Sequence, residues 1–387
     1  MLSKMRRATA TWKSIYILFT RFPYADNVNT HNTLKENPMK SPYSLVGACL
    51  AMALAACSGA QSGSIANPVP AVGAPQTSSV TGAATPSVGQ VQHLASAHKT
   101  TSALILVDNE GAGLGGTISE FPETADGNVA PSSVISTHTQ PLAIAFSSKE
   151  GIGIADGNIN SPGQFGAETF ALATGDFLTG ITCFPKPSST RGVAFDSTGQ
   201  LFVSASLPEG GRAIDVFKPG ASNCAKPKRT ISDEGGLAID SNNLLYVANS
   251  KTATIDIFPA GSSIMEAQIG GSNTGLGAPD TVAVDASPNV YVFDTKTATI
   301  SEFAAGATGN VAPIRAIAGS NTGLDGGNGF SFGLAVSKTS GEIFVSNPGS
   351  NAILGFAATA SGNVAPIQTI AGSGTGLSDP LGITVTE

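Results

Sequence analysis

One pattern of short strands and polar turns repeats along most of this chain, and it limits the possible folds more than any other feature. Its clearest copy is a strand at 236–240, a turn at 241–243 and a second strand at 244–249. Copies too small to bury their own apolar faces must pack against their neighbours. Further copies of the strand pair lie at 142–156, 192–204, 281–294 and 333–347.

Two more strands complete each copy. A third strand ends on phenylalanine, at Phe217, Phe258, Phe303 and Phe356. A fourth is expected to carry the sequence GNVAP, found at 127–131, 309–313 and 362–366. Since proline lacks an N–H and is tolerated only at a sheet edge, this fourth strand should be the outermost. Four antiparallel strands in about 48 residues describe one blade of a β-propeller.

The two ends of the repeat region complete each other. The last strand, 382–386, has no partner after it, and the first copy, 104–121, has no inner strand before it. One blade built from both ends would leave no bare inner edge. With 46 Gly and 23 Pro, the chain also disfavours long helices. We therefore predict an all-β, six-bladed β-propeller of four-stranded antiparallel blades over 102–387, closed by the C-terminal strand joining the N-terminal blade.

These repeats resemble those of NHL-type six-bladed propellers, which read roughly P-x-G-V-A-V-D, G-x-I-Y-V-A-D and R-I-x-x-F. The matching segments are GVAFD at 192–196, GLAID at 236–240 and TVAVD at 281–285. The third strand departs from the pattern, because alanine precedes Thr-Ile in two copies and only Arg212 comes close to the usual arginine. The family spans enzymes, protein-binding modules and RNA-binding modules, so the resemblance implies the fold without selecting a function.

The N-terminal part contains an export signal. The uncharged apolar run 45–57 has 13 residues, too few to span a bilayer but suited to a signal peptide. It ends in Leu-Ala-Ala-Cys, which resembles the bacterial lipobox and makes Cys57 the expected lipid-bearing residue. Ser58, the next residue, resembles an outer-membrane sorting signal. The alternative is an ordinary signal peptide in which Cys57 is incidental.

Four segments follow from this interpretation. Residues 1–38 are expected to be a mis-annotated start or disordered, and 39–57 to be the lipoprotein signal peptide. Residues 58–101 are expected to be a flexible tether, since 58–98 hold no charged residue, with a mean reach of roughly 35 Å. Residues 102–387 form the propeller.

Charge limits the partners of the mature chain. The residues after Cys57 include 13 Lys/Arg and 25 Asp/Glu, a net charge of −12. Such a chain lacks the basic patch that nucleic acid requires. We expect membrane attachment through the lipid alone, a monomeric state and a location in the bacterial cell envelope, anchored to the outer membrane.

Oxygen-bearing side chains recur where second strands end, and could form a ring at the central mouth that holds Ca²⁺. Gluconolactonase-type propellers, which the chain also resembles, hold a divalent metal at that mouth. The alternative is that these side chains cap the following turns. The candidates are Asp108, Asp156, Asn249, Asp294 and Asn347 on the second strands, with Ala205 interrupting the series, and Asp280 and Asp379 at the entries of inner strands.

Other motifs carry little chemistry. G-x-G-x-x-G at 111–116 joins two antiparallel strands rather than opening a helix, and G-x-S-x-G at 329–333 enters an inner strand. His138 is the only histidine of the propeller, so a three-histidine zinc site cannot form. Cys183 and Cys224 either form a disulfide or remain two thiols.

Two functions remain open. The favoured one is a lipid-anchored, non-catalytic propeller, without a cofactor, that binds a protein or glycan partner or acts as a scaffold, because no convincing general base or nucleophile is present. The alternative is a metal-dependent, Ca-type, lactonase-like hydrolase that uses the acidic mouth.

Overall fold

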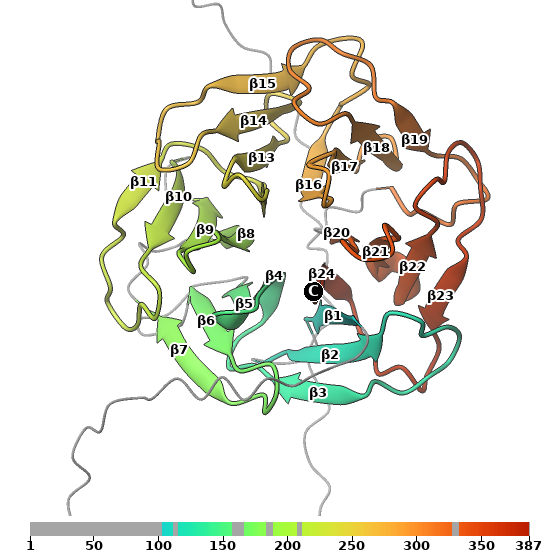
Figure 1. Ribbon diagram of the computed structural model, residues 1–387. Helices are drawn as coiled ribbons and strands as arrows, with labels where there is room; N and C mark the ends of the chain where they lie inside the picture. The colour runs from blue at the N-terminus through green and yellow to red at the C-terminus, as the bar shows by residue number, and fades with distance from the viewer. Residues whose placement is uncertain are drawn as a thin grey trace, which may run out of the picture. The chain divides into compact units, whose positions relative to one another are not determined.

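The repeat folds into a closed ring of six four-stranded antiparallel sheets (Figure 1). The computed structural model describes residues 103–110, 115–156, 166–182, 189–206, 211–326 and 333–386. The predicted all-β, six-bladed propeller is therefore confirmed. In the described residues no helix is long and apolar enough to cross a membrane. Cys57 and the expected signal peptide and tether lie outside the described residues.

Each blade runs from an inner strand at the axis to an outer strand at the rim. Blades 1 to 3 consist of β24 (Pro380–Val385), β1 (Leu104–Asn109), β2 (Thr117–Pro122) and β3 (Ser133–Ser136); β4 (Pro141–Ser147), β5 (Gly151–Asp156), β6 (Ala167–Phe170) and β7 (Phe177–Ile181); and β8 (Ser189–Phe195), β9 (Leu201–Ser206), β10 (Arg212–Phe217) and β11 (Arg229–Ile231).

Blades 4 to 6 follow the same order and contain the regular copies of the repeat. They consist of β12 (Gly236–Ile239), β13 (Leu245–Asn249), β14 (Thr254–Phe258) and β15 (Ala267–Gly270); β16 (Pro279–Val284), β17 (Val290–Asp294), β18 (Thr299–Phe303) and β19 (Arg315–Ile317); and β20 (Leu334–Val336), β21 (Ile343–Asn347), β22 (Ala352–Phe356) and β23 (Gln368–Ala371).

The core lies between neighbouring blades. Second strands are buried on both faces, as in β13 and β17, so they consist almost entirely of apolar residues. The phenylalanine that ends each third strand is buried, and so is an isoleucine on each fourth strand, such as Ile231 and Ile317. Sheets whose two faces both pack on neighbours are stable only within a complete ring.

Strand β24 closes the ring against β1. Val107 pairs with Ile383, and Ile105 pairs with Val385. The backbone of Leu104 exchanges hydrogen bonds with Thr386, through an N–H to Oγ1 contact of 2.8 Å and an N–H to C=O contact of 2.9 Å. The predicted joining of the two chain ends in one blade is confirmed.

The GNVAP segments do not lie in the fourth strands, as the sequence had suggested. They lie in the connection before each of these strands, and their glycines form single parallel bridges to the preceding blade. Gly309 bridges Ile269, and the Asn310 side-chain oxygen accepts the Asn273 N–H at 2.7 Å. Gly127 bridges Ile370 in the same way between blades 6 and 1. GNVAP is therefore a clasp between blades.

The two cysteines of the propeller lie on segments that approach each other. The Thr182 N–H donates to the Asn223 carbonyl at 2.9 Å, one residue before Cys224. Cys224 is disulfide-bonded, which excludes the alternative of a free thiol there. Its predicted partner, Cys183, lies outside the described residues.

Ring closure through β24 predicts that Ile383 contributes more stability than an exposed isoleucine at the rim. Ile383→Ala should lower the free energy of unfolding by about 2–5 kcal/mol, because Ile383 is buried between blades. Ile367→Ala is the control, since 53% of the Ile367 side chain is exposed, and it should change stability by less than about 0.5 kcal/mol. Chemical denaturation measures both; equal effects would contradict the role of β24.

Candidate functional site

The register of the strands places most of the predicted mouth residues at equivalent positions. Asp156 lies opposite Pro141, and Asp294 lies opposite Pro279, each at the end of a second strand. Asn249 and Asn347 also end second strands.

One member of the predicted series was placed wrongly by one residue. In blade 1 the equivalent position is Asn109, opposite Pro380, and not Asp108. In blade 3 it is Ala205, as predicted, because Ala205 and Asn249 each pair with the residue four positions before the phenylalanine that ends the third strand. Asp108 and Asn109 are consecutive polar residues at the end of the same strand, and sequence spacing alone does not show which of them holds the equivalent position.

Asp294 caps turns with both of its carboxylate oxygens. Oδ2 accepts the N–H groups of Gly277 and Ala278 at 2.6 and 2.8 Å, and Oδ1 accepts those of Lys296 and Thr297 at 3.1 Å. This is the capping role considered from the sequence.

Asn347 has the same role in blade 6. Its Oδ1 accepts the Asp325 N–H at 3.0 Å, and its Nδ2 donates to the Gly323 carbonyl at 3.0 Å. Asp379, at the entry of β24, is exposed, and its backbone N–H donates a hydrogen bond to Asn351 Oδ1 at 2.7 Å.

Asp108 and Asp156 are buried between blades instead of lining an open mouth. Asp108 Oδ1 accepts the Gly382 N–H at 2.7 Å, whereas its Oδ2 has no hydrogen-bond partner. Burial raises the pKa of Asp108 to about 8. Burial, with the nearby Glu168 carboxylate, raises the pKa of Asp156, whose Oδ1 accepts the Thr139 hydroxyl. Within the described ranges, no three His, Cys, Asp or Glu side chains are grouped so as to hold a metal ion.

β-Bulges turn two charged side chains toward the axis. The pairing of β8 with β9 shifts between Thr190 and Gly192, and that of β16 with β17 shifts between Pro279 and Thr281. The residues at these shifts, Arg191 and Asp280, line both a central cavity of about 60 Å³ and an adjoining cavity of about 90 Å³. Bulges commonly redirect side chains in this way beside functional sites.

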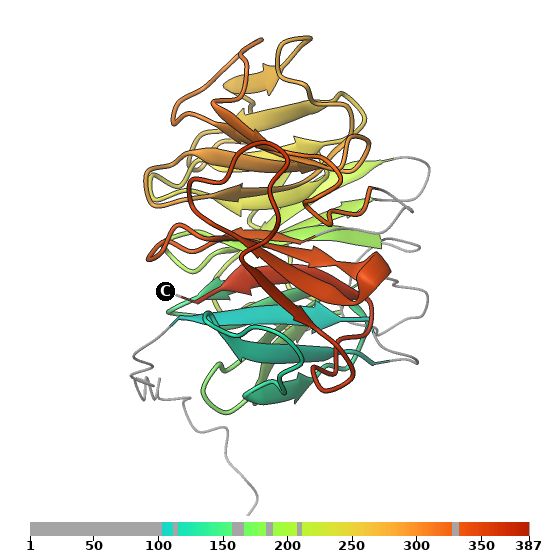
Figure 2. The same ribbon diagram turned by 90° about the vertical axis from the view of Figure 1, so that its right-hand side faces the viewer.

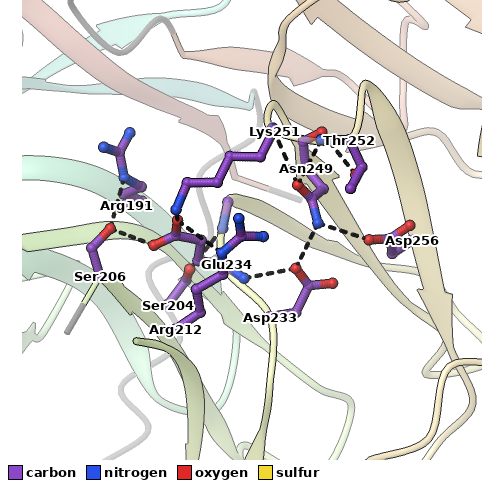
Figure 3. A network of polar contacts seen from close by, with 11 residues as sticks. Arg191, Ser204, Ser206, Arg212, Asp233, Glu234, Asn249, Lys251, Thr252 and Asp256 are labelled. Atoms are coloured by element: carbon purple, nitrogen blue, oxygen red, sulfur yellow. Dashed lines mark hydrogen bonds and ion pairs between the residues drawn. The ribbon is translucent and has the colours of Figure 1, made fainter. Parts of the chain in front are cut away.

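The adjoining cavity holds a charge network centred on Glu234, shown in Figure 3. Lys251 Nζ lies 2.6 Å and Arg212 Nε 3.5 Å from Glu234 Oε1, and the Ser206 hydroxyl donates to Oε2. Arg191 Nε donates in turn to Ser206 Oγ at 3.1 Å. We call Arg191, Ser206, Arg212, Glu234 and Lys251 the mouth cluster.

The mouth cluster combines a buried carboxylate with more exposed cations. Burial opposes ionisation of Glu234, but the contacts of Lys251, Ser206 and Arg191 outweigh it and lower the Glu234 pKa. The Lys251 side chain is 53% exposed, against 7% for Glu234. Three cations surround the carboxylate of Glu234, and Asp280 adds a second carboxylate to the wall of the same cavity. The cations suit the cluster to anionic or hydroxyl-rich groups.

Two further acids, Asp233 and Asp256, adjoin the mouth cluster. Asn249 Nδ2 donates to Asp233 Oδ1 and to Asp256 Oδ2, at 3.0 Å each (Figure 3). Burial, and then the neighbouring Asp256, raises the pKa of Asp233 to about 7. Asn249, one of the predicted mouth residues, therefore orients a carboxylate pair and also borders the adjoining cavity.

Sequence reasoning named Asp280 but missed Arg191, Glu234 and Lys251 as site residues. The available signal was Asp-Glu-Gly-Gly at 233–236, two acids at the entry of an inner strand in a chain with only 12% charged residues. Gly235 has a φ of 153°, and a side chain there would meet the Ala248 carbonyl.

Comparisons with known proteins identify the architecture. No family model and no curated protein matches the chain. A Bacteroides caccae protein of unknown function aligns at a TM-score of 0.52 and 10% identity, covering 74% of this chain and 99% of that one. A chain of the nidogen/laminin complex aligns at 0.53 and 15%, covering 74% and 98%. A periplasmic gluconolactonase of Pseudomonas aeruginosa aligns at 0.46 and 13%, covering 74% and 99%. Identities this low show the fold alone.

The buried carboxyl of Asp108 predicts a pH-dependent stability. Its pKa is raised from 3.8 to about 8, so the folded state holds this proton more tightly, and stability should fall as pH rises from about 4 to about 8. Asp108→Asn should unfold at the wild-type temperature at pH 4 and about 4 °C or more above it at pH 9. Glu266→Gln, at an exposed carboxyl, is the control. Parallel curves for wild type and Asp108→Asn would contradict this prediction.

Proposed function

We propose that this chain is an exported, lipid-anchored and non-catalytic β-propeller of a bacterial cell envelope that binds a protein or glycan partner at the mouth cluster. The NHL-like repeats, the lipobox ending at Cys57 and the uncharged segment 58–98 support the address and the mode of attachment. The mouth cluster supports the binding role.

One observation carries the binding proposal: several charged side chains line one cavity, although only 12% of the residues of the chain are charged. Lys251, Arg191 and Arg212 present positive groups around Glu234, whose carboxylate holds them in place. Fixed cations beside a hollow recognise carboxylate, phosphate or hydroxyl groups of a partner without losing much side-chain entropy.

The alternative proposal is a metal-dependent, lactonase-like hydrolase. Asp108 and Asp156 would supply carboxylate ligands for its metal, since each has one oxygen that lacks a hydrogen-bond partner. Metal analysis of the purified protein, with thermal unfolding in Ca²⁺ and in EDTA, separates the two proposals. Bound metal and a lower unfolding temperature in EDTA would favour the hydrolase over the binding protein.

Photo-crosslinking in cells tests the binding site. Ser250 is exposed beside Lys251 in the cavity, whereas Ser241 is exposed at the opposite end of the same blade. A benzophenone amino acid at 250 should give a specific adduct, and one at 241 should not. Lys251→Glu should reduce the adduct at 250 at least tenfold, because it places a negative charge beside Glu234. Mass spectrometry of the purified adduct identifies a protein partner by its peptides and a glycan partner by its sugar fragments.

Equal adducts at 250 and 241, or an adduct at 250 that Lys251→Glu leaves unchanged, would contradict binding at the mouth cluster. Thermal unfolding of the Lys251→Glu protein keeps this test separate from misfolding.

Metabolic labelling tests the anchor. A radiolabelled or alkyne fatty acid should label the wild-type chain, and the labelled chain should fractionate with the outer membrane. Cys57→Ser should abolish labelling, because the thioether to the lipid cannot form, whereas Cys49→Ser, in the same apolar run, should leave it intact. Labelling of the Cys57→Ser chain would contradict the lipoprotein assignment.

A further inference from the structure

A row of three side chains crosses each blade near the end of the third strand. In blade 5 the row is Tyr291, Glu302 and Arg315, on β17, β18 and β19. Arg315 Nε and Nη2 each lie 2.6 Å from Glu302 Oε2, an ion pair within the blade. The positive charge at this position is therefore neutralised by the neighbouring strand.

The same register holds in all six blades, so the outer two members of the row can be compared directly. Thr169 and Thr179 share a hydrogen bond of 3.0 Å between their hydroxyls. The pairs, from blade 1 to blade 6, are Glu120 and Ser133, Thr169 and Thr179, Val216 and Arg229, Ile257 and Ala267, Glu302 and Arg315, and Gly355 and Gln368.

Blade 3 holds the one pair in which a charged side chain faces an aliphatic one. Arg229 occupies the position of Arg315, but Val216 replaces the glutamate. The Arg229 guanidinium carbon lies 5.6 Å from the centre of the Phe202 ring, and its Nη1 donates to the Ser262 carbonyl. Burial lowers the pKa of Arg229, although Asp196 opposes this effect. In the described chain no carboxylate lies within ion-pair distance of Arg229.

A cavity of about 150 Å³ lies beside this guanidinium, between blades 3 and 4. It is bordered by the turns that join first to second strands and third to fourth strands, so it opens on the face opposite the mouth cluster. Turns project from both faces of the ring in Figure 2. Its apolar wall includes Phe202, Ile231, Leu245 and Phe258.

The acid that borders this cavity is already engaged. Asp196 Oδ1 accepts the N–H groups of Thr198 and Gln200 at 2.9 Å and the Thr198 hydroxyl at 2.7 Å. Its Oδ2 accepts Gln200 Nε2 at 2.6 Å. Lys228 Nζ, which donates to Gln200 Oε1 at 3.0 Å, adds a second positive charge nearby. The neutral donors around Asp196 hold it outside ion-pair distance of Arg229, so the guanidinium has no direct carboxylate partner in the described chain.

We propose that this cavity, which we call the Arg229 pocket, binds a carboxylate with a small branched apolar body. The carboxylate would pair with Arg229 from the side of the cavity, as Glu302 pairs with Arg315 within its blade, and the apolar body would lie against Phe258 and Leu245. A volume of about 150 Å³ is large enough for a ligand the size of benzene. Arginine holds carboxylates through paired N–H groups, and stacking on an aromatic ring fixes its plane. The pocket is separate from the mouth cluster, so its role does not depend on the function proposed above.

Two sources could supply this chemistry, a free branched-chain acid or the C-terminal carboxylate of a peptide. Saturation-transfer NMR on the full mature chain, with isobutyrate and with acetyl-Ala-Ala-Val as probes, distinguishes them. Binding of isobutyrate alone identifies a free acid, and tighter binding of the peptide identifies a chain terminus. Isobutyramide and the peptide amide should bind at least tenfold more weakly, because they lack the charge.

Two variants test the residues. Arg229→Gln should weaken binding of the better probe at least tenfold, whereas Lys218→Gln, an exposed lysine of the same blade, should leave it unchanged. Val216→Glu should restore the blade 5 pair within blade 3 and thereby exclude the probes.

If Val216→Glu does not fold, Arg229→Gln and the amide probes still decide the outcome. Equal binding of acid and amide, unchanged binding by Arg229→Gln, tighter binding of inorganic phosphate than of isobutyrate, or no binding of any probe would overturn the proposal.

Discussion

The pairing of β24 with β1 is the contact on which the whole ring depends. Every blade buries its faces against two neighbours, so an open ring would expose the second strands of its end blades, including Ile105 and Val107. The closure is non-covalent, and the clasp from Gly127 to Ile370 reinforces it at the rim. The cavity at the axis, lined by all six inner strands, exists only when this pairing holds.

A closed repeat makes each blade a control for the others. Backbone register is shared, so a difference in chemistry at one position reflects the side chain and not the fold. Arg315 and Arg229 illustrate this, because the same strand position holds a neutralised arginine in one blade and an arginine without a carboxylate in another. Internal comparison of this kind does not require relatives of the protein.

The sequence was sufficient for the parts of the structure that repeat. Strand order, the buried phenylalanines and the joining of the chain ends all follow from period and apolar pattern. The sites were harder to predict, because Arg191 and Asp280 reach the axis through bulges. In blade 1 two consecutive polar residues end the second strand, and the equivalent position is Asn109 and not the predicted Asp108. Cross-strand pairing, which separates Arg229 from Arg315, becomes visible only when the strands are aligned.

Both candidate sites draw on blades 3 and 4, where the ring departs from its own repeat. The single bridges that clasp blades join blade 6 to 1, 2 to 3, 4 to 5 and 5 to 6 in the described residues. Between blades 3 and 4 the Arg229 side chain contacts the Ser262 carbonyl instead, and on the opposite face Arg212 reaches Glu234. Between blades 3 and 4, contacts of charged side chains thus stand where other blade pairs have a backbone bridge. Both candidate ligand sites use polar side chains that do not belong to the repeating pattern of contacts.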